Sequence, residues 1–119
     1  MNEVLRRFLG PTHALNDGYI SDKAHSGQAE TPGEDARCRV ILEIDDNGCI
    51  GAAFSCFGPP ETIACADWVC EYIYGQYANE ARPPVLRDLE RALALTPVER
   101  YAGLLAIDAL ANAMVNLGR

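Results

Sequence analysis

The chain has 119 residues, of which 49% are hydrophobic and 23% charged, a composition typical of one globular domain, residues 1–119, with its own core. Its net charge of −7 argues against nucleic acid and anionic membranes as partners, because both are bound through basic patches, and favours a basic protein partner. No apolar run reaches the roughly 20 residues of a membrane span, and five cysteines without a secretory signal or a CxxC motif predict free thiols in a cytoplasmic protein.

Residues 2–9 are predicted to form a short amphipathic helix that docks on the rest of the domain. Arg6 and Arg7 lie on one side, and the apolar residues recur at helical spacing on the other: Val4, Leu5, Phe8 and Leu9. The pattern ends at Gly10-Pro11, a pair that stops helices. The apolar side is therefore expected to face the core.

Residues 12–35 have no periodic apolar pattern and are rich in Asn, Asp, Gly, Ser, Gln, Glu and Pro. We interpret them as a long loop with room for one short strand. Both histidines of the chain, His13 and His25, fall in this loop. We interpret them as solvated side chains rather than metal ligands.

Residues 37–57 are predicted to form a β-hairpin, because apolar and polar residues alternate on both sides of an Asp-Asp-Asn-Gly turn. A two-residue Asn-Gly loop would put the two apolar sets out of phase. A three-residue loop over residues 46–48, with Gly48 in the left-handed conformation, pairs Ile44 with Ile50 and keeps both sets on one face. We therefore predict the three-residue loop.

This register places Cys38 directly opposite Cys56 at the open end of the hairpin, with Cβ atoms ~5 Å apart. Two thiols so placed could share a soft metal or be oxidised to a disulfide. The simpler interpretation is that they are half-buried and pack as small hydrophobic side chains.

The stretch from Cys56 to Gly75 joins the hairpin to a helix through a Gly-Pro-Pro corner. Pro59 and Pro60 suit the start of a helix, where a missing N–H costs little, and Glu61 then lies in the first turn, where the helix dipole favours a carboxylate. The helix is predicted to run to Gly75. Its core-facing stripe comprises Ile63, Ala66, Cys70 and Ile73, with Asp67 and Glu71 on another side.

Two further helices are predicted after this one. The first follows Pro83-Pro84, and its apolar residues are Val85, Leu86, Leu89 and Leu93. The second begins at Thr96, which has the capping-box spacing to Glu99, with Pro97 at the first helical position. Gly118 would suit its end, and its buried stripe is predicted to be Leu104, Ile107, Leu110, Ala111, Met114 and Leu117.

The order of elements predicts an α+β fold. A small antiparallel sheet, built from the hairpin 37–57 with room for a third strand, would pack against the N-terminal helix and three C-terminal helices. The chain has no Gly-rich phosphate loop, no GxSxG or HExxH motif, and no close cysteine and histidine typical of thiol enzymes. We therefore expect no enzymatic activity.

Short sequence matches, in order along nearly the whole chain, resemble the IscU/NifU-type scaffolds on which iron–sulfur clusters are built. No single match is specific, but their order and spacing together are. The family fold, an IscU/SufE-like sheet covered by helices, agrees with the elements predicted above. The matching residues are Val4 to Phe8, Pro11, Pro32, Gly48, Phe54, Phe57-Gly58, Ile63-Ala64, Glu71 to Gly75, Leu95 to Val98, Leu105-Ala106 and Asp108-Ala109.

The resemblance implies a ligand site whose residues are replaced in this chain. Scaffolds of this family hold a cluster or zinc with three cysteines, helped by an aspartate and a histidine. Here the three cysteine positions fall on Glu34, Pro59 and Ala102, the aspartate position on Ala36 and the histidine position on Tyr101. An alignment shifted by two residues before Gly48 puts Ala36 and Cys38 at the first cysteine and aspartate positions instead, and the site is still incomplete.

The segment Leu95-Thr96-Pro97-Val98-Glu99 stands where the scaffolds carry a peptide recognised by a dedicated heat-shock chaperone. In that peptide the second residue is proline and the last is lysine, so Thr96 and Glu99 depart from it. A capping box explains both residues through helix stability alone, at ~1 kcal/mol for the cap. We favour the structural explanation and keep the segment as a candidate partner-binding site.

Two functional hypotheses follow. In the first, the chain is a non-canonical, ligand-deficient scaffold relative without a bound cofactor, an accessory protein that binds a cysteine desulfurase, an authentic scaffold or a client metalloprotein. In the second, a metal or sulfur site holding an iron–sulfur cluster or zinc persists at Cys38 and Cys56, with help from Cys65, Glu34 or Tyr101. Cys65 lies early in its helix, where a helix N-terminus can lower a thiol pKa. A purely structural subunit is the third interpretation.

Overall fold

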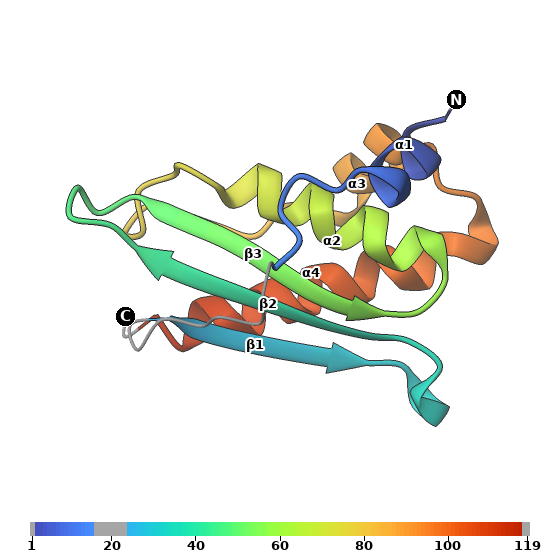
Figure 1. Cartoon of the computed structure of the whole chain (residues 1–119), viewed down its shortest axis with the longest axis horizontal. Coiled ribbons are helices and arrows are strands. Elements are labelled where there is room, and N and C mark those ends of the chain that lie inside the picture. Colours follow the sequence, from blue (N-terminus) through green and yellow to red (C-terminus); the bar gives the residue numbers. More distant parts are fainter. Residues whose placement is uncertain (1, 16–23, 118–119) are drawn as a thin grey trace.

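The structure, a computed structural model, describes residues 2–15 and 24–117. Three strands and four helices follow one another in the order that the α+β class requires, so the predicted class is confirmed (Figure 1). A 3-10 turn precedes β2 and another precedes α4. The elements are α1 (Glu3–Leu9), β1 (His25–Glu30), β2 (Arg37–Ile44), β3 (Ile50–Phe57), α2 (Pro60–Ile73), α3 (Leu86–Leu93) and α4 (Arg100–Val115), with the 3-10 turns at Pro32–Glu34 and Pro97–Glu99.

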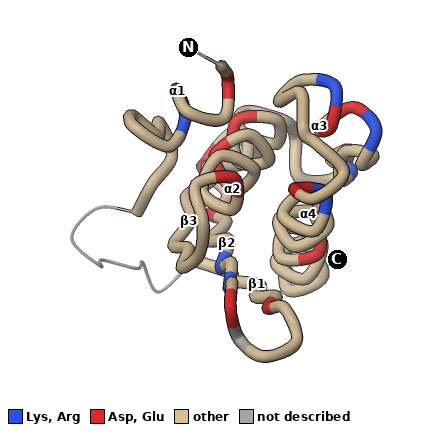
Figure 2. Tube along the Cα trace, turned by 90° about the vertical axis from the view of Figure 1, so that its right-hand side faces the viewer, with Lys and Arg blue, Asp and Glu red and all other residues tan. Residues whose placement is uncertain are grey.

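The sheet is antiparallel with the order β1-β2-β3, and helices cover one of its faces. Figure 2 shows α2 and α4 side by side on that face, with α2 over β3 and α4 over β1, and α1 outside α2. At the far edge of β3, Ala14 adds a short parallel bridge to Phe54. The buried core lies between the sheet and the two long helices.

The hairpin has the predicted register. Ile44 pairs with Ile50 and Cys38 pairs with Cys56. The loop is closed by a hydrogen bond of 2.9 Å from the Asp45 amide to the Cys49 carbonyl, and Gly48 has a φ of +83°, which only glycine adopts easily. The alternation of apolar residues and the turn chemistry point to one pairing, and the three-residue loop is confirmed.

The third strand, β1, lies in the segment predicted to be a long loop with room for one short strand, so that strand is confirmed, and it packs against α4 without large apolar side chains. A Cβ at Gly27 would lie 2.0 Å from the amide nitrogen of Ala113 and 2.5 Å from the carbonyl oxygen of Ala109, so the strand and helix backbones nearly touch. Amide groups on α4 also donate hydrogen bonds of 2.9 Å to the edge carbonyls of the strand: Asn112 to Gln28 and Asn116 to Ser26. Glycine and asparagine therefore join this strand to the helix.

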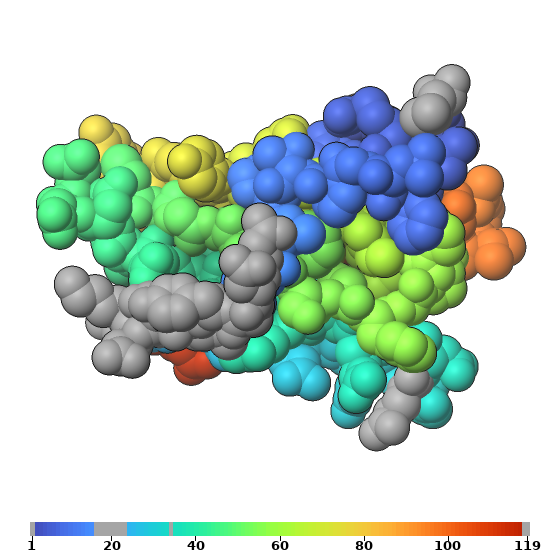
Figure 3. All heavy atoms as spheres, viewed as in Figure 1, coloured from blue at the N-terminus to red at the C-terminus, as the bar shows by residue number. Residues whose placement is uncertain are grey.

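The N-terminal helix docks through Arg7 and through only one of the four predicted apolar residues, Val4. Arg7 is only 5% exposed, whereas the apolar residues Leu5, Phe8 and Leu9 are exposed and Val4 is half-buried. The guanidinium of Arg7 pairs with Asp67 at 2.7 Å and with Glu71 at 2.9 Å, both on α2. The predicted docking is confirmed but its face is wrong, because a buried carboxylate on α2 selects the arginine. Figure 3 shows these N-terminal residues lying over α2.

The buried stripe of α4 is rotated from the prediction. Leu104 is 50% exposed and Ala111 is half-buried, while small residues face the sheet. The stripe is wrong at these two positions because the close approach of β1 at Ala109 and Ala113 selects alanine rather than larger side chains, while Gly103 packs against Leu86 and Leu89 of α3. Gly118 lies outside the described residues. The buried residues are Ala102, Gly103, Leu105, Ala106, Ala109, Leu110, Ala113, Met114 and Leu117.

Within residues 2–15 and 24–117, no helix is both long enough and apolar enough to cross a membrane.

Candidate functional site

Three segments meet at one end of the sheet and border a pocket of about 430 Å³. They are the residues just before β2, the corner between β3 and α2, and the start of α4, on the right in Figure 1. The pocket is lined by Thr31, Pro32, Asp35, Ala36, Pro59 and Tyr101. Residues from three distant parts of the sequence therefore meet in one place.

The pocket brings together three of the five positions that the family resemblance singled out. Ala36, Pro59 and Tyr101 line it, and Ala102 is buried directly after Tyr101. The side chain of Glu34 lies outside the described part of the structure. Ala36 occupies a family ligand position in both alignments considered above, so its place in the pocket does not depend on the choice between them. The ligand roles themselves remain predictions.

The polar groups that line this pocket are oxygen atoms. The hydroxyl of Tyr101 donates a hydrogen bond of 2.8 Å to a carboxylate oxygen of Glu61, which lies in the first turn of α2. Partial burial and this carboxylate raise the pKa of Tyr101, so the phenol stays protonated at neutral pH. Asp35 adds a second carboxylate and Thr31 a hydroxyl. The pocket can accept hydrogen bonds or bind cations, but its lining contains no thiol.

The corner between β3 and α2 is too crowded for any residue except glycine. Gly58 has a φ of +148°, and a Cβ there would lie 2.9 Å from the hydroxyl oxygen of Thr62 and 3.0 Å from the Cβ of Ala36. Ala36 is therefore held against the corner, and the wall that it forms is fixed in position. The short side chain at position 36 is part of this packing.

Cys38 and Cys56 pair across β2 and β3, two residues after Ala36 and three residues before Pro59. The two residues are opposed on the helix-covered face of the sheet, Cys38 being 1% exposed and Cys56 half-buried. A hydrogen bond to Cys56 and burial both raise the pKa of the Cys38 thiol. An open pocket of about 200 Å³ lies on the other face of the sheet at this point, among the outward-facing residues Gln28, Arg37, Arg39, Ser55 and Phe57. The predicted juxtaposition is confirmed, and its role as a metal or sulfur site remains a prediction.

Cys65 does not have the activated thiol that its position suggested. It is fully buried in α2, and burial, followed by the charge of Glu61, raises its pKa to about 12. The expectation that the helix N-terminus lowers this pKa is wrong, because the side chain faces the core. Pro59 and Pro60 also leave few free amides at that helix end.

Neither histidine joins the cysteines. The His13 ring packs against Tyr74 with 5.6 Å between centroids, and His25 begins β1. Over the residues that the structure describes, no three side chains of His, Cys, Asp or Glu are grouped so that they could hold a metal ion.

The segment Leu95–Glu99 forms the predicted capping box. A carboxylate oxygen of Glu99 accepts a hydrogen bond of 2.9 Å from the Thr96 amide and one of 3.1 Å from the Thr96 hydroxyl. Between them, the side chain of Val98 is 82% exposed. The helix start is thus explained by local hydrogen bonds, and one apolar side chain of the segment is left on the surface for a partner.

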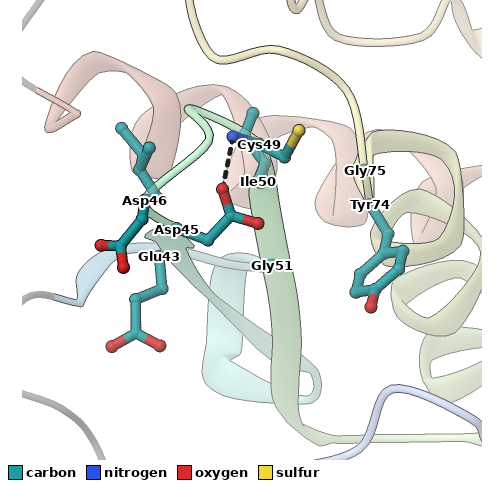
Figure 4. Close-up of a pocket in the computed structure, with 9 residues that line it drawn as sticks. Glu43, Asp45, Asp46, Cys49, Ile50, Gly51, Tyr74 and Gly75 are labelled. Atoms are coloured by element: carbon teal, nitrogen blue, oxygen red, sulfur yellow. Dashed lines mark hydrogen bonds between the residues drawn. The ribbon is translucent and has the colours of Figure 1, made fainter.

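A second pocket, of about 590 Å³, lies at the opposite end of the hairpin. Figure 4 shows Asp45, Asp46 and Cys49 around it, with Tyr74 on its far side. One carboxylate oxygen of Asp45 accepts hydrogen bonds of 2.9 Å from the amides of Cys49 and Asn47, so this group holds the turn. The sequence pattern identified the turn but gave no sign of the pocket, because Tyr74 comes from the end of α2.

Comparison with known proteins gives a consistent result over the full domain. The sequence pattern of the family described as "NifU-like N terminal domain" matches residues 1–118. The iron–sulfur cluster assembly scaffold protein IscU of Escherichia coli K12 is 28% identical over 115 residues, which cover 96% of this chain and 90% of that protein. The iron–sulfur cluster assembly enzyme IscU of Drosophila melanogaster is 30% identical over 79 residues, 66% of this chain and 51% of that protein.

Solved structures show the same fold. The N-terminal part of a nitrogen-fixing NifU-like protein from Brucella abortus superimposes with a TM-score of 0.68 at 14% identity, over 98% of this chain and 92% of that chain. A putative iron–sulfur cluster assembly scaffold protein for the SUF system from Fervidobacterium islandicum superimposes with a TM-score of 0.66 at 15% identity, over 96% and 95% of the two chains. The predicted IscU-like architecture is therefore confirmed.

Proposed function

The chain belongs to the NifU-like N-terminal domain family, and from this premise we propose that it is an accessory protein of iron–sulfur cluster or metallocofactor assembly. It acts by binding other proteins and does not hold a cluster at the family's own ligand positions. In this role it is a ligand-deficient relative of the scaffolds, located in the cytoplasm, without enzymatic activity of its own.

The observation that carries this proposal is the lining of the 430 Å³ pocket. Ala36 and Pro59, which the family resemblance assigns to ligand positions, line it, and neither residue can bind a metal through its side chain. The remaining polar groups, the Tyr101 phenol and the Asp35 carboxylate, are oxygen donors. Iron–sulfur clusters are held chiefly by thiolates, so the residues present do not fit that cargo.

The partner is a protein with a basic surface, since the chain carries a net charge of −7. Three classes of protein fit the family: a cysteine desulfurase, an authentic scaffold and a client metalloprotein. The exposed segment Leu95–Glu99 is our candidate contact, because Val98 presents an apolar side chain between Thr96 and Glu99, the two residues of the capping box.

The proposal is tested by measuring binding of the purified chain to one member of each class by isothermal titration calorimetry at low and moderate salt. We expect binding to at least one of them, weakened at higher salt. Val98→Asp should reduce that affinity at least tenfold, whereas Val115→Asp, at a residue that is 76% exposed on α4, should leave it unchanged. Absence of binding to all three classes would overturn the proposal.

A second function is favoured by the direct pairing of Cys38 with Cys56. In this alternative the chain carries zinc, an iron–sulfur cluster or sulfur at a relocated thiol site built on that pair, with Cys65 close behind it. The test is metal content after incubation with zinc or with iron and sulfide. Replacing both Cys38 and Cys56 by serine should abolish stoichiometric metal, and Cys49→Ser is the control. Metal content unchanged by the double replacement would exclude the pair.

A further inference from the structure

We propose that Cys38 and Cys56 are a thiol–disulfide redox pair, which closes reversibly across the open end of the hairpin. The proposal goes beyond the functions considered above, because it requires neither a metal nor a protein partner. It is carried by the hydrogen-bond pattern of the sheet, the direct pairing of the two cysteines and their unequal exposure.

The sheet pattern places the pair at the kind of position where strands are closest. The Asp45 amide bonds to the Cys49 carbonyl, and hydrogen-bonded and non-hydrogen-bonded pairs alternate from there along an antiparallel ladder. Cys38 and Cys56 are seven residue pairs further along, a non-hydrogen-bonded position. Cα atoms at such positions are about 4.5 Å apart, within the range of about 4.4 to 6.8 Å found for disulfides.

Other hydrogen bonds of β3 confirm that Cys38 and Cys56 occupy a non-hydrogen-bonded pair. The next non-hydrogen-bonded pair along the ladder is Val40 with Phe54. The amide of Phe54 donates to the His13 carbonyl and its carbonyl accepts from the Leu15 amide, so both groups point away from β2. The strands therefore hold the two cysteines in a bonding position without any change in register. No residue lies between them in the ladder, because Cys38 and Cys56 are direct pairing partners.

The unequal exposure of the two residues assigns their roles. Cys56 is half-buried whereas Cys38 is 1% exposed, so Cys56 is the thiol that meets an oxidant. Cys38 is buried with a raised pKa, so it stays protonated until its neighbour has reacted. Cys56, the more exposed residue, attacks first, and Cys38 then displaces the small thiol to form the disulfide.

The oxidant by class is a low-molecular-weight disulfide, and the exchange balances in two steps. The Cys56 sulfur attacks one sulfur of the disulfide, which forms a mixed disulfide and releases one small thiol. The Cys38 sulfur then attacks the Cys56 sulfur, the bond to the small thiol breaks, and the departing thiolate takes the proton of Cys38. Two protein thiols are oxidised while one small disulfide is reduced to two thiols.

The bond would join the two strands that carry walls of the 430 Å³ pocket. Ala36 precedes Cys38 by two residues, and Pro59 follows Cys56 by three. Oxidation therefore restrains the spacing of these walls, and reduction releases it. The remaining cysteines have no such geometry, because Cys49 lies in the turn at the other end of the hairpin.

The test equilibrates the reduced, full-length protein with mixtures of oxidised and reduced glutathione, followed by intact mass and peptide mapping after quenching. We expect a mass loss of two hydrogen atoms per chain and a single linked peptide pair containing Cys38 and Cys56, in full-length protein and in Cys49→Ala alike. Cys56→Ala should retain all of its thiols. Cys38→Ala should accumulate the mixed disulfide with glutathione on Cys56, because nothing resolves it.

Wild-type protein that keeps five thiols, or that links another pair of cysteines, would overturn the proposal. These readouts do not use partner binding or metal, so their outcome is separate from that of the proposed function. If Cys38→Ala fails to fold, the mapping of the wild-type protein decides the question alone.

Discussion

Gly27 is the residue at which the third strand depends most directly on the absence of a side chain. The strand backbone lies so close to α4 that a Cβ would overlap backbone atoms of Ala113 and Ala109, and backbone cannot move aside as a flexible side chain does. The glycine therefore fixes how near α4 approaches the sheet. It thereby helps to place the start of α4, where Tyr101 lies.

Gly27→Ala is accordingly expected to lower the free energy of unfolding by about 3 kcal/mol or more, a cost typical of overpacking against an immovable neighbour. Gly51→Ala is the matched control, because Gly51 also lies within a strand and its nearest atom, the carbonyl oxygen of Glu43, is 3.8 Å from the added carbon. That variant should change stability by less than about 1 kcal/mol. Urea unfolding of both variants measures the difference, and equal stabilities would contradict the backbone contact.

The buried thiol of Cys65 links stability to alkaline pH. In the folded chain its pKa is raised to about 12, chiefly by burial, whereas in the unfolded chain it ionises near the ordinary value of 9.0. The unfolded state therefore loses its proton first, and the free energy of unfolding falls as the pH rises above about 9.

We expect the fall in stability between pH 8 and pH 10.5 to be smaller in Cys65→Ala than in wild-type protein. Urea midpoints at the two values measure this, and Cys49→Ala, at a half-buried turn cysteine, serves as the control with the wild-type slope. A Cys65→Ala slope as steep as that of wild type would show that this thiol is already ionised in the fold.

At the scale of elements, α1 shows where amphipathic periodicity fails. The sequence pattern predicts a helix there and its docking, but it assigns the wrong face, because the deciding partner Asp67 is sixty residues away. Asp67 also accepts a hydrogen bond of 2.8 Å from the His13 amide. Its buried carboxylate on α2 needs a cationic partner, and Arg7 provides it. No local pattern in residues 2–9 contains that information.

Replacing Arg7 by methionine should destabilise the fold by about 3 to 5 kcal/mol, because Asp67 would be left buried without its charged partner. Arg6→Met is the matched control: Arg6 pairs only with Glu3 on the same helix and its side chain is 55% exposed, so the loss should be below about 1 kcal/mol. Thermal and urea unfolding distinguish the two. If both variants lost a similar amount of unfolding free energy, the buried ion pair of Arg7 would not be what docks the helix.

The hairpin, in contrast, was predictable in full. Alternation on both strands and the Asp-Asp-Asn-Gly turn are local signals, and they agree on one register, including the pairing of Cys38 with Cys56. The strand β1 gave no such signal, because glycine contact and side-chain amides from α4 replace the usual alternating apolar residues. The stripe of α4 was misplaced for a related reason, since alanine and glycine carry the contact.

At the scale of the whole molecule, resemblance to a family supplied what periodicity could not. The positions named from it come from the loop before β2, the corner before α2 and the start of α4, and three of them meet in one pocket. The hydrogen bond between Glu61 and Tyr101, which lines that pocket, spans forty residues and left no sequence pattern. The pocket could be described only from the fold, whereas the resemblance named Ala36, Pro59 and Tyr101 beforehand as candidate positions.

We propose that this fold does not hold an iron–sulfur cluster at the positions that the family resemblance assigns to ligands. The most direct test is the iron and acid-labile sulfide content of the full chain, purified without oxygen and incubated with iron and sulfide. The same measurement is made on the variant Glu34→Cys/Pro59→Cys/Ala102→Cys, which places thiols at the three positions that the resemblance assigns to cysteines. A second variant replaces Glu34→Cys by Ala36→Cys, for the alternative alignment. We predict no stoichiometric iron and sulfide in the wild-type chain and a gain in at least one variant. Stoichiometric iron and sulfide in the wild-type chain, retained when Cys38 and Cys56 are both serine, would contradict the account.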